Sequence, residues 1–375
     1  MPAINRREKI MRIAQIAPLY EATPPLKYGG TERVVSYLTE ELVRQGHEVT
    51  LFASGDSITN AELISCSPKS LRTDNSCIDP LARHYVMLQK VAEQSERFDM
   101  LHFHIDYLHF PFSVNNNYKH LSTLHGRLDL PDLKPLYEQF SYVPVVSISD
   151  HQRKPLPFAG WVETVYHGIP ADLHTIGNGG GNYLAFLGRI SPEKRVDRAI
   201  EIAKRVGMKI KIAAKIDKVD EEYFNKNIFP LLDHPLVEFI GEITEIEKRN
   251  FLRDAVALLF PIDWPEPFGM VMIESMAAGT PVIAFNKGSV PEIIDNGLTG
   301  FIVENVDDAV KAVNALPTLS RAECRKVFEH RFSAERMANQ YLSIYCRLIE
   351  NKNPINRTNQ QQILNSLKSN INVCG

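Results

Sequence analysis

Two acidic residues, Glu266 and Glu274, flank a segment rich in proline, glycine and apolar residues. The apolar run 257–260 before them predicts a strand, and Gly279 after them predicts the end of a helix. In that helix Glu266 lies at the entrance and Glu274 two turns further on, about 12 Å away at roughly 1.5 Å per residue. This separation is close to the distance between a hexose and a ribose that are connected by a folded pyrophosphate. The two carboxylates are therefore candidates to hold sugar hydroxyls.

The backbone between these carboxylates predicts an anion site. The amides of Phe268, Gly269 and Met270 lie at the start of the predicted helix, where N–H groups have no partner within the helix. Such amides and the positive end of the helix dipole favour a negative group, for example a phosphate.

Arg189 and Lys194 are candidates for a diphosphate-binding pair. Arg189 ends a predicted strand; Ser191 suits an N-cap and Pro192 a first helical residue, which places Lys194 in the first turn of a helix to residue 206. A planar Arg fork and a Lys point charge together suit a diphosphate, and they stabilise a departing nucleotide without a divalent metal. Alone, such a pair is more typical of a solvated surface, but the two glutamates favour the binding role.

Gly29 and Gly30 precede a helix predicted over residues 31–45, between strands predicted at 11–17 and 47–53. Glycines at this point let backbone amides approach an anion closely, so both residues are candidates to contact a phosphate. The dinucleotide fingerprint G-x-G-x-x-G is absent. A turn that merely needs glycine is the alternative interpretation.

Polar residues follow further predicted strands, at 99–104, 121–125, 144–149 and 162–167. In open parallel sheets ligands bind beyond the carboxyl ends of the strands. These ends predict a cleft lined by His104, Asp106, His125, Gly126, Ser149 and His167.

Among the histidines, His125 is the strongest candidate, because Gly126 after it leaves room for a ligand. Structural packing is the alternative for this side chain. His102 and His104 share one strand face, but no Cys or carboxylate spacing completes a metal site, so no metal is expected.

Length and composition limit the class of protein. The chain has 375 residues, 44% of them hydrophobic, which suits two domains of about 150 to 170 residues. A net charge of −3 gives no support for a nucleic-acid partner. Five scattered cysteines and the lack of a signal peptide or membrane-spanning run predict a cytoplasmic protein, with peripheral membrane contact left open.

Strands and helices alternate twice along the chain, which predicts an α/β fold of two Rossmann-like α/β/α domains facing a central cleft. The second alternation has predicted strands at 183–187, 209–213, 237–240, 257–260, 281–285 and 300–303. The glycine-rich segment 174–182 is interpreted as a linker between domains 1–173 and 183–332. Residues 351–375, rich in Asn and Gln, are predicted to be a poorly ordered tail.

Several motifs together resemble a known family. They are Gly188-Arg189 followed by Pro-Glu-Lys194, the Glu266 and Glu274 pair around Glu-Pro-Phe-Gly, Gly288-Ser-Val-Pro-Glu292, and Gly297-Leu-Thr-Gly300-Phe-Ile-Val303. Over about residues 11–350 the chain resembles the retaining nucleotide-sugar glycosyltransferases of family four, which adopt the GT-B fold. The resemblance implies a C-terminal donor domain, an N-terminal acceptor domain and a last helix, about 333–350, that packs back on the latter.

The resemblance also implies residue roles. Glu266 would bind the donor sugar with Phe268, Gly269 and Met270 beside it, and Glu274 the ribose. Arg189 and Lys194 would bind the diphosphate, with Gly29 and Gly30 near the phosphates, and His125 would approach the reacting centre. The catalytic set implied is His125, Glu266, Arg189 and Lys194, with no metal and no cofactor.

Two departures from the family pattern limit this transfer. The usual Asn-Gly-Ile-Asp turn is His167-Gly168-Ile169-Pro170 here. The glycine-rich turn after the second C-terminal strand is replaced by residues 213–217, where Lys215 is a candidate to contact the base. A UDP-sugar such as UDP-glucose is favoured because it is the commonest donor in the family.

The function expected is hexosyl transfer from a nucleotide sugar to an acceptor hydroxyl with retention. A sugar-nucleotide epimerase or hydrolase of the same fold, and a non-catalytic nucleotide-sugar sensor, are the alternatives. The acceptor is predicted to bind near His104, Asp106, His125 and the loop 21–28, and saccharide, lipid and small-molecule acceptors stay open.

Overall fold

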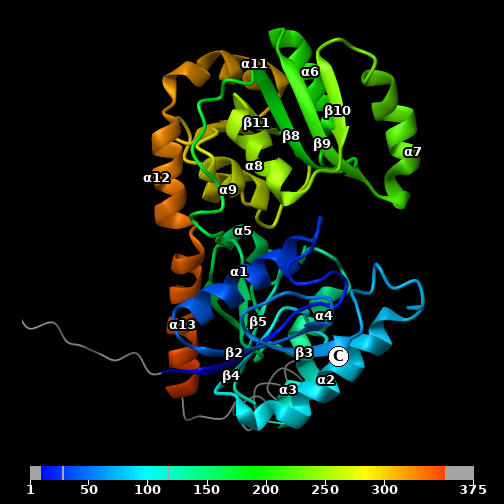
Figure 1. Ribbon diagram of the computed structural model, residues 1–375, viewed down its shortest axis with the longest axis vertical. Coiled ribbons are helices and arrows are strands. Elements are labelled where there is room, and N and C mark those ends of the chain that lie inside the picture. The colour runs from blue at the N-terminus through cyan, green and yellow to red at the C-terminus, as the bar shows by residue number, and fades with distance from the viewer. Residues whose placement is uncertain (1–9, 28, 117, 351–375) are drawn as a thin grey trace, which may run out of the picture.

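Two parallel β-sheets, each covered by helices, form the two halves of the molecule (Figure 1). The computed structural model describes residues 10–27, 29–116 and 118–350. The expectations for residues 1–9, for Tyr28 and for the tail 351–375 lie outside these described residues. The GT-B fold expected from the sequence is confirmed.

The N-terminal sheet has seven parallel strands in the order β3-β2-β1-β4-β5-β6-β7. Six of its strands were predicted to within a few residues, whereas the edge strand β3 was missed. The strands are β1 (Arg12–Ile16), β2 (Glu48–Ser54), β3 (Glu62–Ser67), β4 (Met100–Phe103), β5 (His120–Thr123), β6 (Val145–Ser147) and β7 (Trp161–Thr164).

The C-terminal sheet has six parallel strands in the order β10-β9-β8-β11-β12-β13. All six were predicted, because each is rich in apolar residues and is bounded by polar residues, glycine or proline. They are β8 (Tyr183–Ile190), β9 (Lys209–Ile216), β10 (Val237–Gly241), β11 (Ala257–Phe260), β12 (Val282–Phe285) and β13 (Gly300–Val303).

Helices connect these strands and cover both sheets (Figure 1). The α-helices are α1 (Gly30–Arg44), α2 (Pro80–Gln94), α3 (Phe110–Asn116), α4 (Leu133–Gln139), α5 (Asp150–Arg153), α6 (Val196–Val206), α7 (Glu221–Tyr223), α8 (Glu245–Asp254), α9 (Met270–Ala277), α10 (Val290–Ile293), α11 (Val306–Ala315), α12 (Arg321–Arg331) and α13 (Ala334–Glu350). Shorter helical turns lie at Ser95–Arg97, Lys218–Asp220, Phe224–Ile228, Phe229–Leu231 and Leu316–Thr318. The continuous helix predicted near 220–232 is thus a series of short turns.

The strand orders explain where a ligand can bind. In the first sheet β1 lies between β2 and β4, and in the second sheet β8 lies between β9 and β11. The connections leave in opposite directions at these points, which opens a crevice at the carboxyl ends of the strands. The two crevices face each other between the domains.

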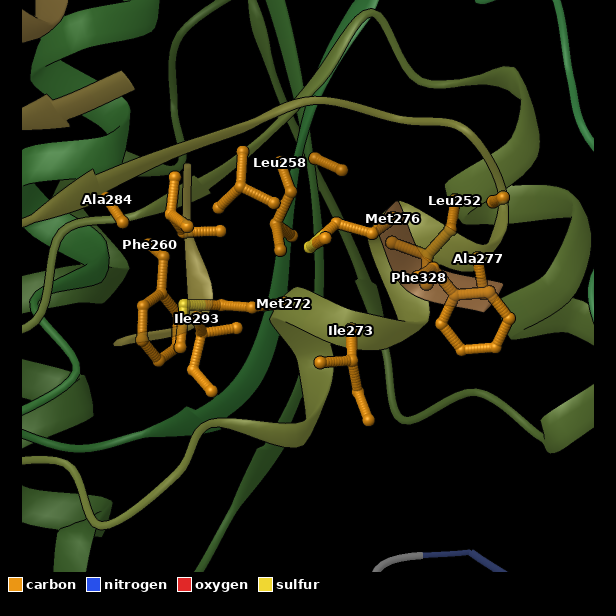
Figure 2. Packing of buried hydrophobic residues seen from close by; sticks show 14 of the residues in the cluster. Leu252, Leu258, Phe260, Met272, Ile273, Met276, Ala277, Ala284, Ile293 and Phe328 are labelled. Carbon is orange, nitrogen blue, oxygen red and sulfur yellow. The ribbon is translucent and has the colours of Figure 1, made fainter. Parts of the chain in front are cut away.

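Helix α9, which carries Glu274, is anchored by apolar side chains. Met272, Ile273 and Met276 are fully buried. They pack within one cluster with Phe260 of β11 and Phe328 of α12 (Figure 2). Because interiors are close-packed, this helix has little freedom to shift relative to the second sheet.

The helix predicted from Glu266 begins later, at Met270. Prolines on both sides of Glu266 remove amide donors and push the preceding residues towards extended conformations. Gly269, directly before the helix, has a left-handed φ of 79°. Glu266 therefore lies in a loop, and the predicted straight helical rise of eight residues to Glu274 is wrong.

The helix predicted to contain Lys194 also begins later, at Val196. Arg195 has a left-handed φ of 53°, which interrupts the helical conformation before that point. Residues 191–194 form a turn in which the Lys194 N–H donates to the Ser191 carbonyl at 3.1 Å. The expected N-cap role of Ser191 and the first-turn position of Lys194 are both wrong.

Helix α13 leaves the C-terminal half and packs against the first sheet and α1 (Figure 1). The chain crosses between the halves twice at adjacent positions. The Ile169 N–H donates to the Phe332 carbonyl at 3.0 Å, and the Ala334 N–H donates to the Ile169 carbonyl at 2.9 Å.

None of the helices in the described ranges has the length and apolar character to cross a membrane.

Buried hydroxyls join α13 to the first sheet. The Tyr345 hydroxyl lies 2.6 Å from Nδ1 of His102 and accepts from Nε2 of Gln15 at 3.3 Å. The Tyr341 hydroxyl lies 2.8 Å from Oγ1 of Thr123. Buried polar atoms need such partners, so this network fixes the position of α13 on the sheet.

Replacing Tyr345→Phe should lower the stability of the N-terminal half by about 1–3 kcal/mol, because it leaves polar atoms of Gln15 and His102 unpaired in the core. Urea unfolding of the full chain measures the change. The control is Tyr85→Phe, whose half-exposed side chain should change stability by less than about 0.5 kcal/mol. Equal losses in the two variants would contradict the role of the network.

Candidate active site

A cleft of about 1050 Å³ lies between the two halves. Ligand pockets typically measure roughly 300–1,000 Å³, so this cleft has room for two substrates. All the binding residues proposed from the sequence line it: Gly29, Gly30, His125, Arg189, Lys194, Lys215, Glu266, Phe268, Gly269, Met270 and Glu274.

Most of the residues expected at the strand ends also line the cleft, namely His104, Asp106, Gly126 and His167. Ser149 does not lie among the described residues that line it. Its hydroxyl accepts from the Gln152 N–H at 3.0 Å and caps α5, so this residue has a structural role.

Glu266 is held by two side chains. Its Oε2 accepts a hydrogen bond from Lys194 Nζ and another from Trp264 Nε1 at 3.1 Å. The Lys194 ammonium also lies 5.0 Å from the centre of the Trp264 ring. The second oxygen, Oε1, has no hydrogen-bond partner among the described residues. This oxygen is available to a hydroxyl in the cleft.

The loop around Glu266 rests directly on Gly288. A Cβ at this glycine would lie 2.4 Å from both the amide nitrogen and the carbonyl oxygen of Glu266. Ser289 fixes the same loop, since its N–H donates to the Glu266 carbonyl at 3.0 Å and its hydroxyl to the Phe268 carbonyl at 2.9 Å. The carboxylate is thus positioned by the 288–289 turn as well as by Lys194.

Two residues that follow Glu266 line the cleft and have amides that are unpaired within the described part of the chain. The N–H groups of Phe268 and Gly269 donate to no acceptor among the described residues, and both residues line the cleft. They precede the N-terminus of α9, where unpaired N–H groups favour an anion. The predicted anion site is therefore compatible with the later start of the helix.

Arg189 and Lys215 flank one carboxylate at the end of the second sheet. Arg189 Nη1 lies 3.5 Å from Asp217, and Lys215 Nζ lies 3.0 Å from the same carboxylate. Arg189 also pairs with Glu193 at 3.2 Å, while its buried Nε has no partner among the described residues. Several cationic donors therefore converge on this end of the cleft.

Gly29 and Gly30 begin α1 on the opposite wall. Gly29 has a φ of 152°, and a Cβ there would lie 2.8 Å from Pro25. A Cβ at Gly30 would meet no atom within 4 Å. Glycine at 29 is thus required by the turn, whereas glycine at 30 leaves the first turn of the helix open towards the cleft.

Glu274 carries an ion pair that the sequence did not reveal. Lys248 of α8 donates to its Oε1 at 2.5 Å, and both side chains are buried. Burial raises the pKa of Glu274, but Lys248, His174 and Arg33 outweigh burial and hold the pKa below its ordinary value. Glu274 is therefore a carboxylate at neutral pH.

His125 is partly buried and lies beside buried imidazoles. Its Nε2 lies 2.9 Å from Nδ1 of His104, whose Nε2 lies 2.8 Å from Oε1 of Gln15. Burial lowers the pKa of His125 to about 3, so the ring is neutral at physiological pH. Its buried Nδ1 has no partner among the described residues. A neutral ring of this kind suits a hydroxyl better than a charged phosphate.

His167, at the turn that departs from the family pattern, lies between the two halves. Its ring stacks on His125 with the ring centres 5.2 Å apart and meets Phe268 at 4.8 Å. Its position therefore links the N-terminal histidines to the Glu266 loop.

Across the described ranges, no three His, Cys, Asp or Glu side chains converge in the manner of a metal site.

Asp106 has a strained backbone and a side-chain carboxyl whose pKa is raised. Its backbone has a left-handed φ of 51°, which is uncommon for a residue other than glycine. Burial raises the pKa of Asp106 to about 6, against the opposing effect of a hydrogen bond from the His125 backbone N–H. Strain and a shifted pKa in a cleft are typical of functional residues.

The two facing parallel-sheet halves, the cleft between them and the helix that crosses back define a GT-B glycosyltransferase architecture. Residues 28–179 match the family described as Glycosyltransferase Family 4, and residues 175–330 match the family described as Glycosyl transferases group 1. The chain belongs to this family of group 1 and family 4 glycosyltransferases.

Two relatives match different lengths of the chain. A 41.2 kDa protein of the cps region of Klebsiella pneumoniae is 25% identical over 365 residues, which span 84% of this chain and 96% of that protein. The N-acetyl-alpha-D-glucosaminyl L-malate synthase of Bacillus anthracis is 31% identical over 117 residues, covering 29% of this chain and 30% of the synthase. The chain thus spans less than a third of this characterised relative.

A solved structure shares the whole fold. The Anabaena protein HepE, in complex with UDP and glucose, superposes with a TM-score of 0.70 at 16% identity. The match covers 90% of this chain and 100% of HepE. At this identity the likeness concerns the fold alone.

Replacing Gly288→Ala should lower glycosyl transfer by roughly a hundredfold while the chain stays folded, because the added Cβ displaces the Glu266 backbone. Steady-state assays and melting temperature measure the two effects. The control is Gly297→Ala: the φ is positive at both glycines, 58° at Gly288 and 79° at Gly297, but a Cβ at Gly297 meets no atom within 4 Å. Similar activity losses in both variants would show that backbone strain, and not the displaced loop, is responsible.

Proposed function

We propose that the protein transfers a hexose from a nucleotide diphosphate sugar to an acceptor hydroxyl with retention of anomeric configuration and without a metal ion. The observation that carries this proposal is the convergence of Glu266, Glu274, Arg189 and Lys194 in one cleft, opposite His125 of the other half. Family membership supports the class of reaction.

The donor in this proposal lies along the C-terminal wall. Glu266 binds hexose hydroxyls, Glu274 binds the ribose, and Lys215 is placed near the base. Arg189 and Lys194 bind the diphosphate, with Gly29 and Gly30 facing it from the other half. A UDP-sugar such as UDP-glucose is the favoured donor, and the complexes of HepE with UDP and glucose and with UDP-glucose support this choice.

Retention is proposed to arise from attack on the face that the nucleotide leaves. The acceptor oxygen forms a bond to the anomeric carbon while the bond from that carbon to the β-phosphate oxygen breaks. The electron pair of the broken bond leaves with the nucleoside diphosphate, and the acceptor proton passes to a phosphate oxygen. Arg189, Lys194 and the amides of Phe268 and Gly269 stabilise the departing charge.

This route assigns Glu266 to positioning and not to nucleophilic attack. A carboxylate nucleophile would need to approach the anomeric carbon from the side opposite the leaving group. Oε2 of Glu266 is engaged by Lys194 and Trp264, which favours a fixed carboxylate that accepts hydroxyl hydrogen bonds through Oε1. His125, which is neutral, is placed to bind a hydroxyl near the reacting carbon.

The acceptor is proposed to bind the N-terminal wall beside Asp106 and His125. An ionised Asp106 accepts a hydrogen bond from a second hydroxyl of the acceptor, which leaves the proton of the attacking hydroxyl for the phosphate and orients the attacking oxygen towards the anomeric carbon. The neighbouring Tyr20, Tyr85 and Tyr107 also line this part of the cleft and are partly exposed.

Product analysis tests the proposal against its alternatives. The protein is incubated with UDP-glucose, alone and with an array of saccharide, lipid and small-molecule acceptors, and the products are analysed by mass spectrometry and NMR. An acceptor product with the donor's anomeric configuration is expected. An epimerised nucleotide sugar or free sugar from donor alone would instead favour an epimerase or hydrolase, and binding without turnover would favour a sensor.

Replacing Glu266→Gln should reduce turnover by roughly a hundredfold, because the amide no longer pairs with Lys194 and misplaces the sugar. Nucleotide affinity, measured by calorimetry, should change by less than about threefold, since ribose and phosphate contacts are kept. Glu304→Gln, in the loop after β13, serves as the control. An unchanged turnover of the Glu266 variant would sink this assignment.

The acceptor KM should rise as pH falls below about 6, because protonation of Asp106 removes its acceptor role. In Asp106→Asn the acceptor KM should be about tenfold higher at pH 7.5 and nearly constant down to pH 5. Asp129→Asn, at an exposed ion pair with Arg127, should behave as the wild type. A wild-type pH profile in the Asp106 variant would rule out this role.

A further inference from the structure

Four charged side chains form a continuous chain from the N-terminal half to Glu274. Arg33 of α1 donates to Oε2 of Glu245 at 2.6 Å, and Lys248 Nζ lies 2.9 Å from the same carboxylate oxygen. Lys248 then donates to Oε1 of Glu274. None of the four side chains is more than 19% exposed. The chain thus crosses between the halves largely shielded from water.

The chain leaves one carboxylate oxygen at its end for a ligand. Oε1 of Glu274 is engaged by Lys248, whereas Oε2 has no hydrogen-bond partner among the described residues. Glu274 lines the cleft, and helix α9 holds its backbone firmly through Met272 and Met276. The orientation of the carboxylate therefore depends on Lys248.

We propose that Lys248 and Arg33 are positioning residues for ribose recognition: Lys248 orients Glu274, and Arg33 orients Lys248 through Glu245. This inference rests on the proposed function, in which Glu274 binds the donor ribose. Neither cation touches the ribose, and both act through the carboxylate.

Electrostatics explain why Lys248 is needed. Without it, Arg33 would be the remaining cation of this charged chain for both Glu245 and Glu274 in a poorly hydrated interface, and repulsion between the two carboxylates would favour protonation of one of them. A protonated or rotated Glu274 would lose charge-assisted hydrogen bonds to the 2′- and 3′-hydroxyls. The loss would be specific to the ribose hydroxyls and would not affect the phosphates.

Arg33 connects the same chain to the phosphate side of the cleft. Its Nη2 donates to the Lys27 carbonyl at 2.5 Å, in the loop that leads to Gly29 and Gly30. The Arg33 guanidinium therefore contacts the loop before α1 and is linked, through Glu245 and Lys248, to the carboxylate of Glu274. Separation of the two halves would break the link between Arg33 and Glu245 and leave Glu274 less firmly oriented.

The test compares two nucleotides that differ only in the ribose hydroxyls. Binding of UDP and of 2′,3′-dideoxy-UDP is measured by calorimetry for the wild type, Lys248→Met and Arg33→Met. The wild type should bind UDP at least about tenfold more tightly than the dideoxy form. Lys248→Met should weaken UDP roughly tenfold and leave dideoxy-UDP within about twofold, so that the preference approaches one. Arg33→Met should reduce the preference in the same direction by a smaller factor.

Matched controls separate positioning from general loss of charge. Arg253→Met lies on the same helix as Lys248, and Arg44→Met lies on the same helix as Arg33, where it is exposed and pairs with Glu41. Both controls should keep the wild-type preference. Lys248→Arg keeps the cation and should restore part of the preference lost in Lys248→Met. A merely structural defect would weaken both nucleotides equally.

The outcomes distinguish this inference from the proposed function. If the wild type binds none of UDP, ADP and GDP, the proposed function fails and the inference fails with it. If the wild type binds UDP and dideoxy-UDP equally, the ribose role of Glu274 fails. If the wild type prefers UDP and the folded Lys248 and Arg33 variants keep the full preference, only the positioning role is overturned. Melting temperatures establish folding, and Arg33→Met decides the question if Lys248→Met does not fold.

Discussion

The pairing of buried charges governs the cleft. Each acidic residue of the C-terminal half that lines the cleft lies near a cation: Glu242 near Lys27, Glu245 near Arg33, Glu266 near Lys194 and Glu274 near Lys248. A buried ion whose partner is removed is strongly destabilising, so these pairs must form in the folded chain. The same pairing explains how a diphosphate would bind. The phosphates would share Lys194 and Arg189 with the carboxylates that already contact them, so each carboxylate would keep a cation beside it.

Much of the fold was predictable from the sequence because parallel strands buried on both faces are continuous apolar runs. The central strands β11 and β12 of the second sheet follow this pattern, and Gly300–Val303 was predicted to the residue. Strand β3 was missed because Glu62–Ser67 mixes polar and apolar residues at a sheet edge. The candidate site was found because Glu266 and Glu274 lie in one short segment, where residue spacing along the chain limits their separation in space.

The rest was not predictable, because it depends on tertiary contacts or on unusual backbone angles. Nothing in the sequence marks Arg195 as left-handed, and that single angle moves Lys194 out of the helix. Lys248 and Arg33 come from segments far from Glu274 and from each other, so only the folded chain brings them together. The capping sequence that starts α8 at Thr244 predicts a helix, but it does not indicate what the first turn contacts.

The two halves contact each other both where the chain crosses between them, near Ile169, and at the mouth of the cleft, near Lys27. At the crossing, Ile169 makes backbone bonds to the start of α13, and Glu292 accepts from the amides of Asp150 and His151 at 2.7 Å. At the mouth, Lys27 and Glu242 lie 3.6 Å apart, and the Lys27 side chain is largely exposed. Ion pairs at the surface contribute little to stability. At the mouth the Arg33 and Glu245 pair is the strong contact, and the backbone bonds at the crossing are where we expect a hinge if the two halves separate. Because Arg33 of α1 pairs with Glu245 of α8 across the cleft, any separation of the two halves about this crossing would break the charged chain.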